Sequence, residues 1–137
     1  MDFIEWKESL RVGIDVVDEQ HQELFRRTNL LLEACKQRKG KEAIGELLNY
    51  LEGYTRLHFK QEEELQLQYG FDEYESHKKM HEGFIREISR LRKRLEGQGP
   101  TSSLVIEASQ TLVEWLLRHV GVEDKKLHKF VVDRSIQ

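Results

Sequence analysis

The sequence has almost no proline and almost no cysteine, with one of each in 137 residues. Because proline interrupts helices, a chain whose only proline is Pro100 can form long helices over nearly its whole length. The single cysteine, Cys35, excludes an internal disulfide framework and favours a reducing compartment. Cys35 also falls on an apolar helical face, so we expect it in the core and not as a reactive thiol.

The chain also lacks a long apolar run, a signal peptide and an excess of basic residues. No stretch approaches the ~20 apolar residues of a membrane span, and the N-terminus has no secretory pattern. We therefore expect a cytoplasmic protein without a membrane partner. The net charge of −3 argues against nucleic acid as a partner. With 34% charged residues, the exposed faces are expected to be highly charged, which favours a monomer; a protein partner cannot be identified.

Apolar residues recur at steps of three and four, which predicts four helices. The first is expected to begin at Asp18, as N-cap, and to end before Gly40. The others are expected over Lys41–Tyr69, from Asp72 (with Glu75 as its capping-box partner) to the loop at 97–101, and from Ser102 or Ser103 onward. Residues 1–17 are expected to form an ordered arm, and residues 18–131 the bundle with a C-terminal segment. That short helical segment carries Leu127, Phe130, Val131 and Ile136.

Long amphipathic helices joined by short connections predict an all-α fold, an antiparallel up-down-up-down four-helix bundle. The length predicts a single domain over residues 1–137.

Five of the six histidines lie on the apolar faces of these helices. His58 with Glu62, and His77 with His81, are four residues apart, only ~40° around a helix, so each pair points the same way. A lone inward histidine is more often a hydrogen-bonded core residue. Five of them with a carboxylate favour a metal site, because an unpaired buried carboxylate costs several kcal/mol. The candidate ligands are His21, His58, Glu62, His77, His81 and His119.

The seventh candidate, Asp124, follows His119 by five residues. That spacing is ~140° on a regular helix, so the two side chains cannot both point inward unless the helix breaks or widens to a π-type turn near Gly121. On spacing alone, Glu123 competes with Asp124. His128 lies off the predicted inward face and is expected to be exposed.

The number and type of these side chains restrict the metal. Five imidazoles and two carboxylates are too many for one tetrahedral zinc ion, and calcium and magnesium prefer oxygen ligands. A mixed nitrogen and oxygen set suits two octahedral iron ions bridged by carboxylates. The His-Glu-x-x-His pattern of zinc proteases and the Glu-x-x-His pattern of ferritin-like proteins do not occur in the sequence.

Together, these motifs resemble the hemerythrin family, and specifically its single-domain bacterial members. The family pattern is a lone His, His-x-x-x-Glu, His-x-x-x-His and His-x-x-x-x-Asp, in that order. The surroundings G-I-D (13 to 15), D-E-Q-H (18 to 21) and W-L-x-x-H (115 to 119) are also similar. The resemblance covers about residues 6 to 130 and favours Asp124 over Glu123. The chain departs from residues common in the family at Gln66 and at Phe71-Asp72.

The resemblance implies two non-haem iron ions with an oxo or hydroxo bridge, also bridged by Glu62 and Asp124. Three histidines (His77, His81 and His119) would hold one iron, and His21 and His58 the other, which keeps an open position. The implied function is reversible O2 binding, with O2 taken up as hydroperoxide on the two-histidine iron, for oxygen storage, delivery or sensing and without catalysis. The alternatives are a di-iron enzyme that reduces O2, peroxide or nitric oxide, and a bundle in which the metal is purely structural.

Overall fold

The computed structural model describes residues 4–136, and all regular secondary structure in that range is helical. The predicted all-α class is therefore confirmed. The elements are η1 (Glu8–Leu10), α1 (Asp15–Lys36), α2 (Gly40–Tyr69), α3 (Tyr74–Gln98), α4 (Ser102–Glu114), η2 (Trp115–Asp124) and α5 (Lys125–Ile136).

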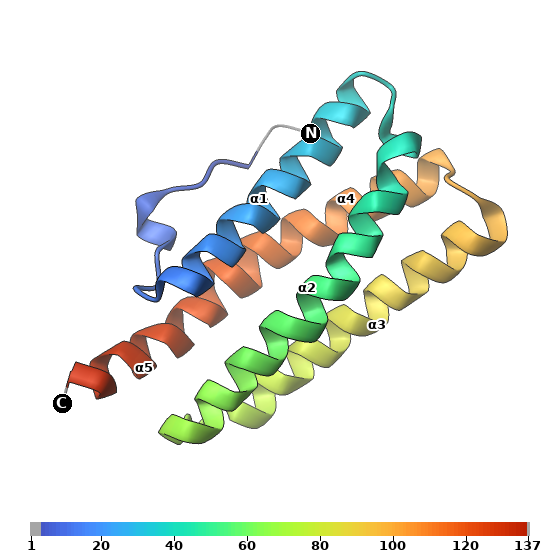
Figure 1. Ribbon diagram of the computed structural model, residues 1–137. Helices are drawn as coiled ribbons and strands as arrows, with labels where there is room; N and C mark the ends of the chain where they lie inside the picture. Colours follow the sequence, from blue (N-terminus) through green and yellow to red (C-terminus); the bar gives the residue numbers. More distant parts are fainter. Residues whose placement is uncertain (1–3, 137) are drawn as a thin grey trace.

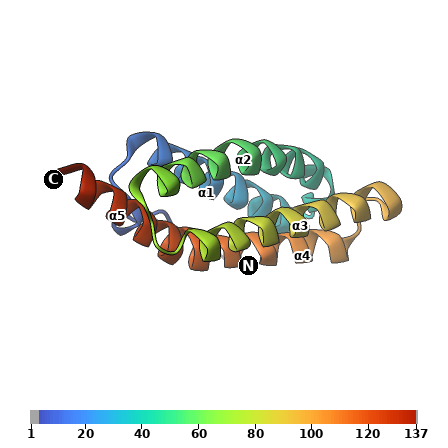
Figure 2. The ribbon, with the colours of Figure 1, turned by 90° about the horizontal axis from the view of Figure 1, so that it is seen from below.

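The four long helices form an antiparallel bundle. Consecutive helices run in opposite directions, and α4, η2 and α5 continue one another as a single rod (Figure 1). Seen from below, α1 and α2 lie on one side of the bundle and α3 and α4 on the other (Figure 2). Each of α1 and α3 packs against both α2 and α4. The predicted up-down-up-down arrangement is thus present.

The apolar faces of the helices form a main core and a smaller cluster. Leu24, Leu48, Leu51 and Leu112 are among the fully buried side chains of the main core. Each such leucine contributes about 1.5–3 kcal/mol through removal from water. The smaller cluster consists of Phe71, Leu127 and Val131, with Phe130 at its edge, and it fixes α5 against the turn between α2 and α3. The side chain of Ile136 lies outside the described residues.

The described part of the N-terminal arm, residues 4–14, lies along α1 (Figure 1). The backbone of Ile4 exchanges two hydrogen bonds with the Asn29 side chain, each 2.8 Å long. The Trp6 ring packs edge-on against Phe25, with 5.4 Å between the ring centroids. The arm is therefore part of the packed structure, as predicted; its residues 1–3 lie outside the described residues.

Asp18 is not the N-cap of the first helix, so that prediction is wrong. The helix begins three residues earlier, at Asp15. The buried Asp18 carboxylate instead accepts the backbone N–H groups of Val12, at 2.8 Å, and Gly13, at 3.3 Å. Asp18 therefore ties the arm to the bundle.

The first helix ends at Lys36, before Gly40 as predicted, and the ends predicted for the other helices agree with the structure to within two residues. The C-terminus of α2 is followed by Gly70, whose φ of 68° is the left-handed conformation that glycine tolerates. The third helix begins at Tyr74 and has no side-chain cap, so the capping box predicted for Asp72 and Glu75 is wrong. At the start of α4, the Thr101 hydroxyl accepts the N–H of Leu104 at 3.2 Å. Within residues 4–136, none of the helices has the length and hydropathy needed to span a bilayer.

Candidate metal centre

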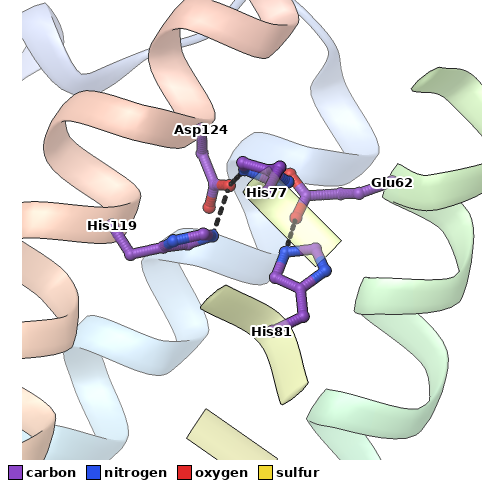
Figure 3. Close-up of side chains that lie close together, drawn as sticks. All are labelled: Glu62, His77, His81, His119 and Asp124. Atoms are coloured by element: carbon purple, nitrogen blue, oxygen red, sulfur yellow. Dashed lines mark hydrogen bonds and ion pairs between the residues drawn. The ribbon is translucent and has the colours of Figure 1, made fainter. Parts of the chain in front are cut away.

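The structure brings all seven predicted site residues together inside the bundle. His21 comes from α1, His58 and Glu62 from α2, His77 and His81 from α3, and His119 and Asp124 from η2. All seven are buried, and both carboxylates are fully inaccessible to solvent. Figure 3 shows Glu62, His77, His81, His119 and Asp124, which point toward one another from α2, α3 and η2. The i, i+4 spacing explains the pairs on α2 and α3, because each pair occupies one face of a straight helix.

His119 and Asp124 both point inward because the chain between them is a π-helix, which confirms the predicted widening. In a π-helix the hydrogen bonds join residues five apart, so side chains at that spacing lie on one face. The His119 Nε2 atom lies 2.9 Å from Asp124 Oδ1. At Gly121, a Cβ atom would lie only 3.3 Å from the carbonyl oxygen of Leu116, so glycine suits the widened turn. Glu123 is partly exposed, 3.8 Å from Lys126.

The two carboxylate oxygens of Asp124 face two different groups of histidines. Oδ1 lies 3.0 Å from His77 Nε2 and 2.9 Å from His119 Nε2. Oδ2 lies 3.3 Å from His21 Nε2. Asp124 therefore spans the interval between the histidines of α3 and η2 and the histidine of α1.

Glu62 also stands between the two groups. Its Oε1 lies 3.3 Å from His58 Nε2 and 3.2 Å from His81 Nε2. Its Oε2 lies 2.7 Å from Nε2 of His128, a residue that was expected to be exposed. That expectation is wrong, because His128 is fully buried. The signal that could have revealed it is spacing: His128 follows Asp124 by four residues, so an inward Asp124 places His128 on the same helical face.

Many of these polar atoms have no hydrogen-bond partner among the described residues. They are Nε2 of His21, His58, His81 and His119, with Oε1 of Glu62 and Oδ2 of Asp124. Buried polar atoms are nearly always paired, whereas lone pairs that converge without hydrogen-bond alignment are what a cation requires.

The converging atoms form two overlapping groups, each with its ligand atoms within 4.8 Å of one another. Glu62 and Asp124 belong to both. One group adds His77, His81 and His119, and the other adds His21 and His58. This donor set fits metal ions.

Residues 12–131 match the family model described as the Hemerythrin HHE cation binding domain. The chain belongs to the hemerythrin family. It is similar to Bacteriohemerythrin from Pseudomonas paraeruginosa, with 36% identity over 119 residues, which cover 87% of this chain and 75% of that protein. Bacteriohemerythrin from Stenotrophomonas maltophilia is 31% identical over 125 residues, or 91% of this chain and 79% of the relative. A Hemerythrin-like protein from Naegleria gruberi is 29% identical over 121 residues, 88% and 87% of the two chains.

Two histidines of this hemerythrin centre are oriented by acceptors on their outer side. His58 Nδ1 lies 2.5 Å from Gln20 Oε1, and His81 Nδ1 lies 3.2 Å from Glu63 Oε2. Each acceptor favours a hydrogen on Nδ1, which leaves the Nε2 lone pair free for the centre. These outer contacts were not predicted from the sequence.

Gln66 and Phe71, two positions where the chain departs from residues common in the hemerythrin family, both contact His77. The side-chain amide nitrogen Nε2 of the buried Gln66 lies 2.6 Å from His77 Nδ1. The Phe71 ring meets the His77 imidazole edge-on, with 6.5 Å between the centroids. Both residues therefore help to fix the ring orientation of His77, and neither replaces a ligand-type side chain.

The pKa shifts of the two carboxylates and of His119 suit metal binding. Burial alone would raise the pKa of Glu62 and of Asp124, but the surrounding histidines outweigh it and hold both pKa values well below their ordinary range. Burial also lowers the pKa of His119, against the opposing effect of Asp124. Burial would lower the pKa of His77 as well, but its hydrogen bond with Asp124 and the charge of that carboxylate raise it. The carboxylates are thus ionised, and the His119 imidazole is neutral at neutral pH, as metal ligands must be.

Aromatic rings enclose the hemerythrin centre. Trp115 stacks on His119 and Phe59 on His81, each with 3.8 Å between ring centroids. Tyr54 stacks on His58 at 4.8 Å. The apolar side chains of Phe25, Leu51, Phe84, Leu112 and Trp115 are also buried in the bundle. Such walls keep water from the centre and admit small apolar molecules.

Two surface hollows reach the edge of the centre. One, of about 460 Å³, is lined by His58 together with Gln20 and Tyr54. The other, of about 540 Å³, lies between α3 and the α4–η2 rod and is lined by His119 and Trp115. The centre is therefore buried but close to the surface on two sides.

Proposed function

We propose that this chain holds two non-haem iron ions, linked by an oxo or hydroxo bridge, and binds O2 reversibly. In this proposal, Glu62 and Asp124 are shared by both ions. His77, His81 and His119 complete one ion, and His21 and His58 hold the other. The observation that supports it best is that the two donor groups overlap only in the two carboxylates. A shared carboxylate is the ligand expected between paired ions.

The unequal division of the histidines supports O2 binding over a purely structural metal. Three histidines face one ion and two face the other, so the second ion has one protein ligand fewer, which leaves room for a small molecule. The hollow beside His58 lies on that side. Two ferrous ions would supply the two electrons that reversible O2 binding requires.

The chain itself contributes positioning and exclusion of water. Gln20 and Glu63 hold the outer nitrogens of His58 and His81, so both imidazoles keep their orientation. Phe59, Tyr54 and Trp115 cover the imidazoles with apolar surface. A dry enclosure of this kind limits irreversible oxidation, so it supports binding over catalysis.

We also propose that residues 1–137 act as one domain and as a monomer. One continuous core joins α1, α2, α3, α4 and η2, which supports a single domain. Exposed ion pairs such as Arg26–Glu23 and Arg90–Glu87 lie on the outer helix faces, which supports a monomer.

An optical experiment tests the function. The iron-loaded protein is reduced without air, O2 is admitted, and O2 is then removed. A visible charge-transfer band that appears with O2 and disappears on its removal is expected. Rapid irreversible oxidation would instead indicate an enzyme that reduces O2. A protein with two irons, no band and no O2 uptake would indicate a structural metal.

A further inference from the structure

We propose that His128 is a positioning residue of the centre, which donates its Nε2–H to Oε2 of Glu62 and does not bind a metal ion. This inference rests on the proposed iron site. It adds an eighth side chain to the seven predicted ones and gives it a different task. Its basis is the contact between Glu62 and His128, both fully buried, at 2.7 Å.

The geometry of this contact differs from that of four of the five ligand-type histidines. The Nε2 atom of His128 forms an aligned hydrogen bond with the carboxylate. Four other Nε2 atoms lie 2.9 to 3.3 Å from carboxylate oxygens without such alignment, those of His21, His58, His81 and His119. The fifth, His77, does hydrogen-bond a carboxylate, because its Nε2 lies 3.0 Å from Asp124 Oδ1. His77 nevertheless belongs to one of the two groups of converging ligand atoms, whereas His128 falls outside both. It therefore approaches Glu62 from outside the centre.

The helix register explains how His128 arrives there. The π-helix directs Asp124 inward, and regular α-helix resumes at Lys125. Four residues later His128 lies on the same face as Asp124. The neighbouring Leu127 and Val131 pack against Phe71, which holds α5 in this position. The α4–η2–α5 rod thus places the Asp124 carboxylate in the centre and, one turn later, places His128 where it can donate to the Glu62 carboxylate.

The proposal assigns His128 a tautomer opposite to that of His58 and His81. In His58 and His81 the outer Nδ1 faces an acceptor, so the hydrogen sits on Nδ1 and Nε2 presents a lone pair. In His128 it is Nε2 that faces the acceptor, because an ionised carboxylate can only accept. Its Nδ1 is buried and has no partner among residues 4–136 that are described.

The hydrogen bond holds Glu62 in one orientation. With Oε2 bound by His128, Oε1 stays between His58 and His81, one from each donor group. Without the bond, the carboxylate can rotate about its last side-chain torsion, and Oε2 loses a buried donor. Outer contacts of this kind typically change metal affinity by about 10- to 100-fold.

Nitrogen NMR tests the tautomer directly in the full-length wild-type protein. With histidine labelled by nitrogen-15, two-bond proton–nitrogen correlations show which ring nitrogen carries the hydrogen; H128Q assigns the signal. We expect hydrogen on Nε2 of His128 in the metal-free protein and in the protein loaded with Zn²⁺ as a diamagnetic probe. If Nε2 of His128 carries no hydrogen in the metal-free protein, His128 cannot donate the proposed hydrogen bond to Glu62. If Nε2 loses its hydrogen only when the protein is loaded with Zn²⁺, His128 binds the metal as a ligand. Either result overturns the proposal.

Metal release tests the positioning role. The protein is loaded with Fe²⁺ without air and mixed with a chromophoric chelator. Glutamine can place an amide N–H near the position of Nε2, whereas the shorter asparagine cannot and phenylalanine has no donor. We expect release about 10-fold faster from H128N and H128F, and close to the wild-type rate from H128Q.

Equal rates in all four proteins would overturn the proposal, as would equally fast release from all three variants, because the donor would then not be the property that matters. Both experiments are carried out without O2. Failure of O2 binding would therefore leave their outcome unchanged, and failure of the His128 proposal would not affect the optical test.

Discussion

At the residue scale, a shift of one residue along the helix decides which of two adjacent carboxylates points into the centre. Asp124 is fully buried with a histidine at each oxygen, whereas Glu123 next to it is partly exposed beside Lys126. Both residues carry the same charge, so composition cannot distinguish them. Their position on the π-helix does, because only Asp124 is five residues from His119.

Replacing each of the two carboxylates by its amide tests this assignment. We expect D124N to retain at least 10-fold less iron after anaerobic loading and desalting, because both donor groups lose a shared anionic oxygen. The matched control E123Q should retain as much iron as the wild type. Iron per chain, measured with a chromophoric chelator after denaturation, reports the result. Full iron content in D124N, or a loss in E123Q, would contradict the assignment.

Tyr50, which is not one of the ligand-type residues, provides a second prediction at this scale. Burial raises the pKa of Tyr50 to about 12, and the charge of Glu23 adds to the effect. The folded-state pKa lies above the unfolded value of about 10. The contribution of Tyr50 to stability is therefore complete below pH 10 and is lost as the pH rises towards 12.

The absorbance of ionised tyrosine near 295 nm measures the titration of Tyr50. The difference between wild type and Y50F should show one phenol that titrates near pH 12, and Y50F should lose less stability than the wild type between pH 10 and pH 12. A difference that titrates near pH 10 would mean that Tyr50 is exposed in solution.

At the element scale, the fold was easier to predict than the details of its ends. The apolar periodicity predicts the helices because burying one face per helix dominates their stability. Asp18 and Asp72 have the composition of N-caps, but tertiary contacts decide their roles. Asp18 binds the arm, and α3 begins beyond Asp72. Periodicity does not encode such long-range contacts.

The same reasoning explains which site residues the sequence could predict. His58, Glu62, His77 and His81 follow from regular helical spacing. His128 was missed because the widening predicted near Gly121 was applied to Asp124 but not to the residues beyond it. The π-helix shifts the face by about one residue, so His128 turns inward. The outer partners Gln20 and Glu63 could not be predicted either, since their contacts join different helices.

The corner between α1 and α2 gives a prediction about packing. At Gly40, an added Cβ would lie 2.8 Å from Val105 and 3.0 Å from Cys35, whereas nothing lies within 4 Å of one at Gly45. We expect G40A to lower the free energy of unfolding by about 1–3 kcal/mol through overpacking. The helical control G45A should raise it by about 0.5–1 kcal/mol. Denaturant unfolding measures both, and a neutral G40A would show that α4 can move away from this corner.

At the scale of the whole molecule, the centre joins four separate segments of the chain. Without metal, Glu62 and Asp124 oppose each other in the interior and rely on the histidines alone. A metal that binds only the folded protein stabilises it by about 2.7 kcal/mol at 100 times Kd. For a domain of this size, we expect removal of iron by a chelator to lower Tm by on the order of 10 °C.

Thermal unfolding followed by circular dichroism, with and without iron, measures this difference. The control E123Q should show the same shift, and D124N should show little. An unchanged Tm in the metal-free wild type would indicate that the carboxylates gain nothing from the metal.

The order in which the ribosome makes the helices has a consequence for the newborn protein. A chain synthesised only through α3 already carries His21, His58, Glu62, His77 and His81, but it lacks the rod that brings His119, Asp124 and His128. An unfinished chain therefore has no way to close the centre. Iron could then occupy the closed centre only after this rod has been made, so bound iron would distinguish chains that include the rod from chains that stop at α3.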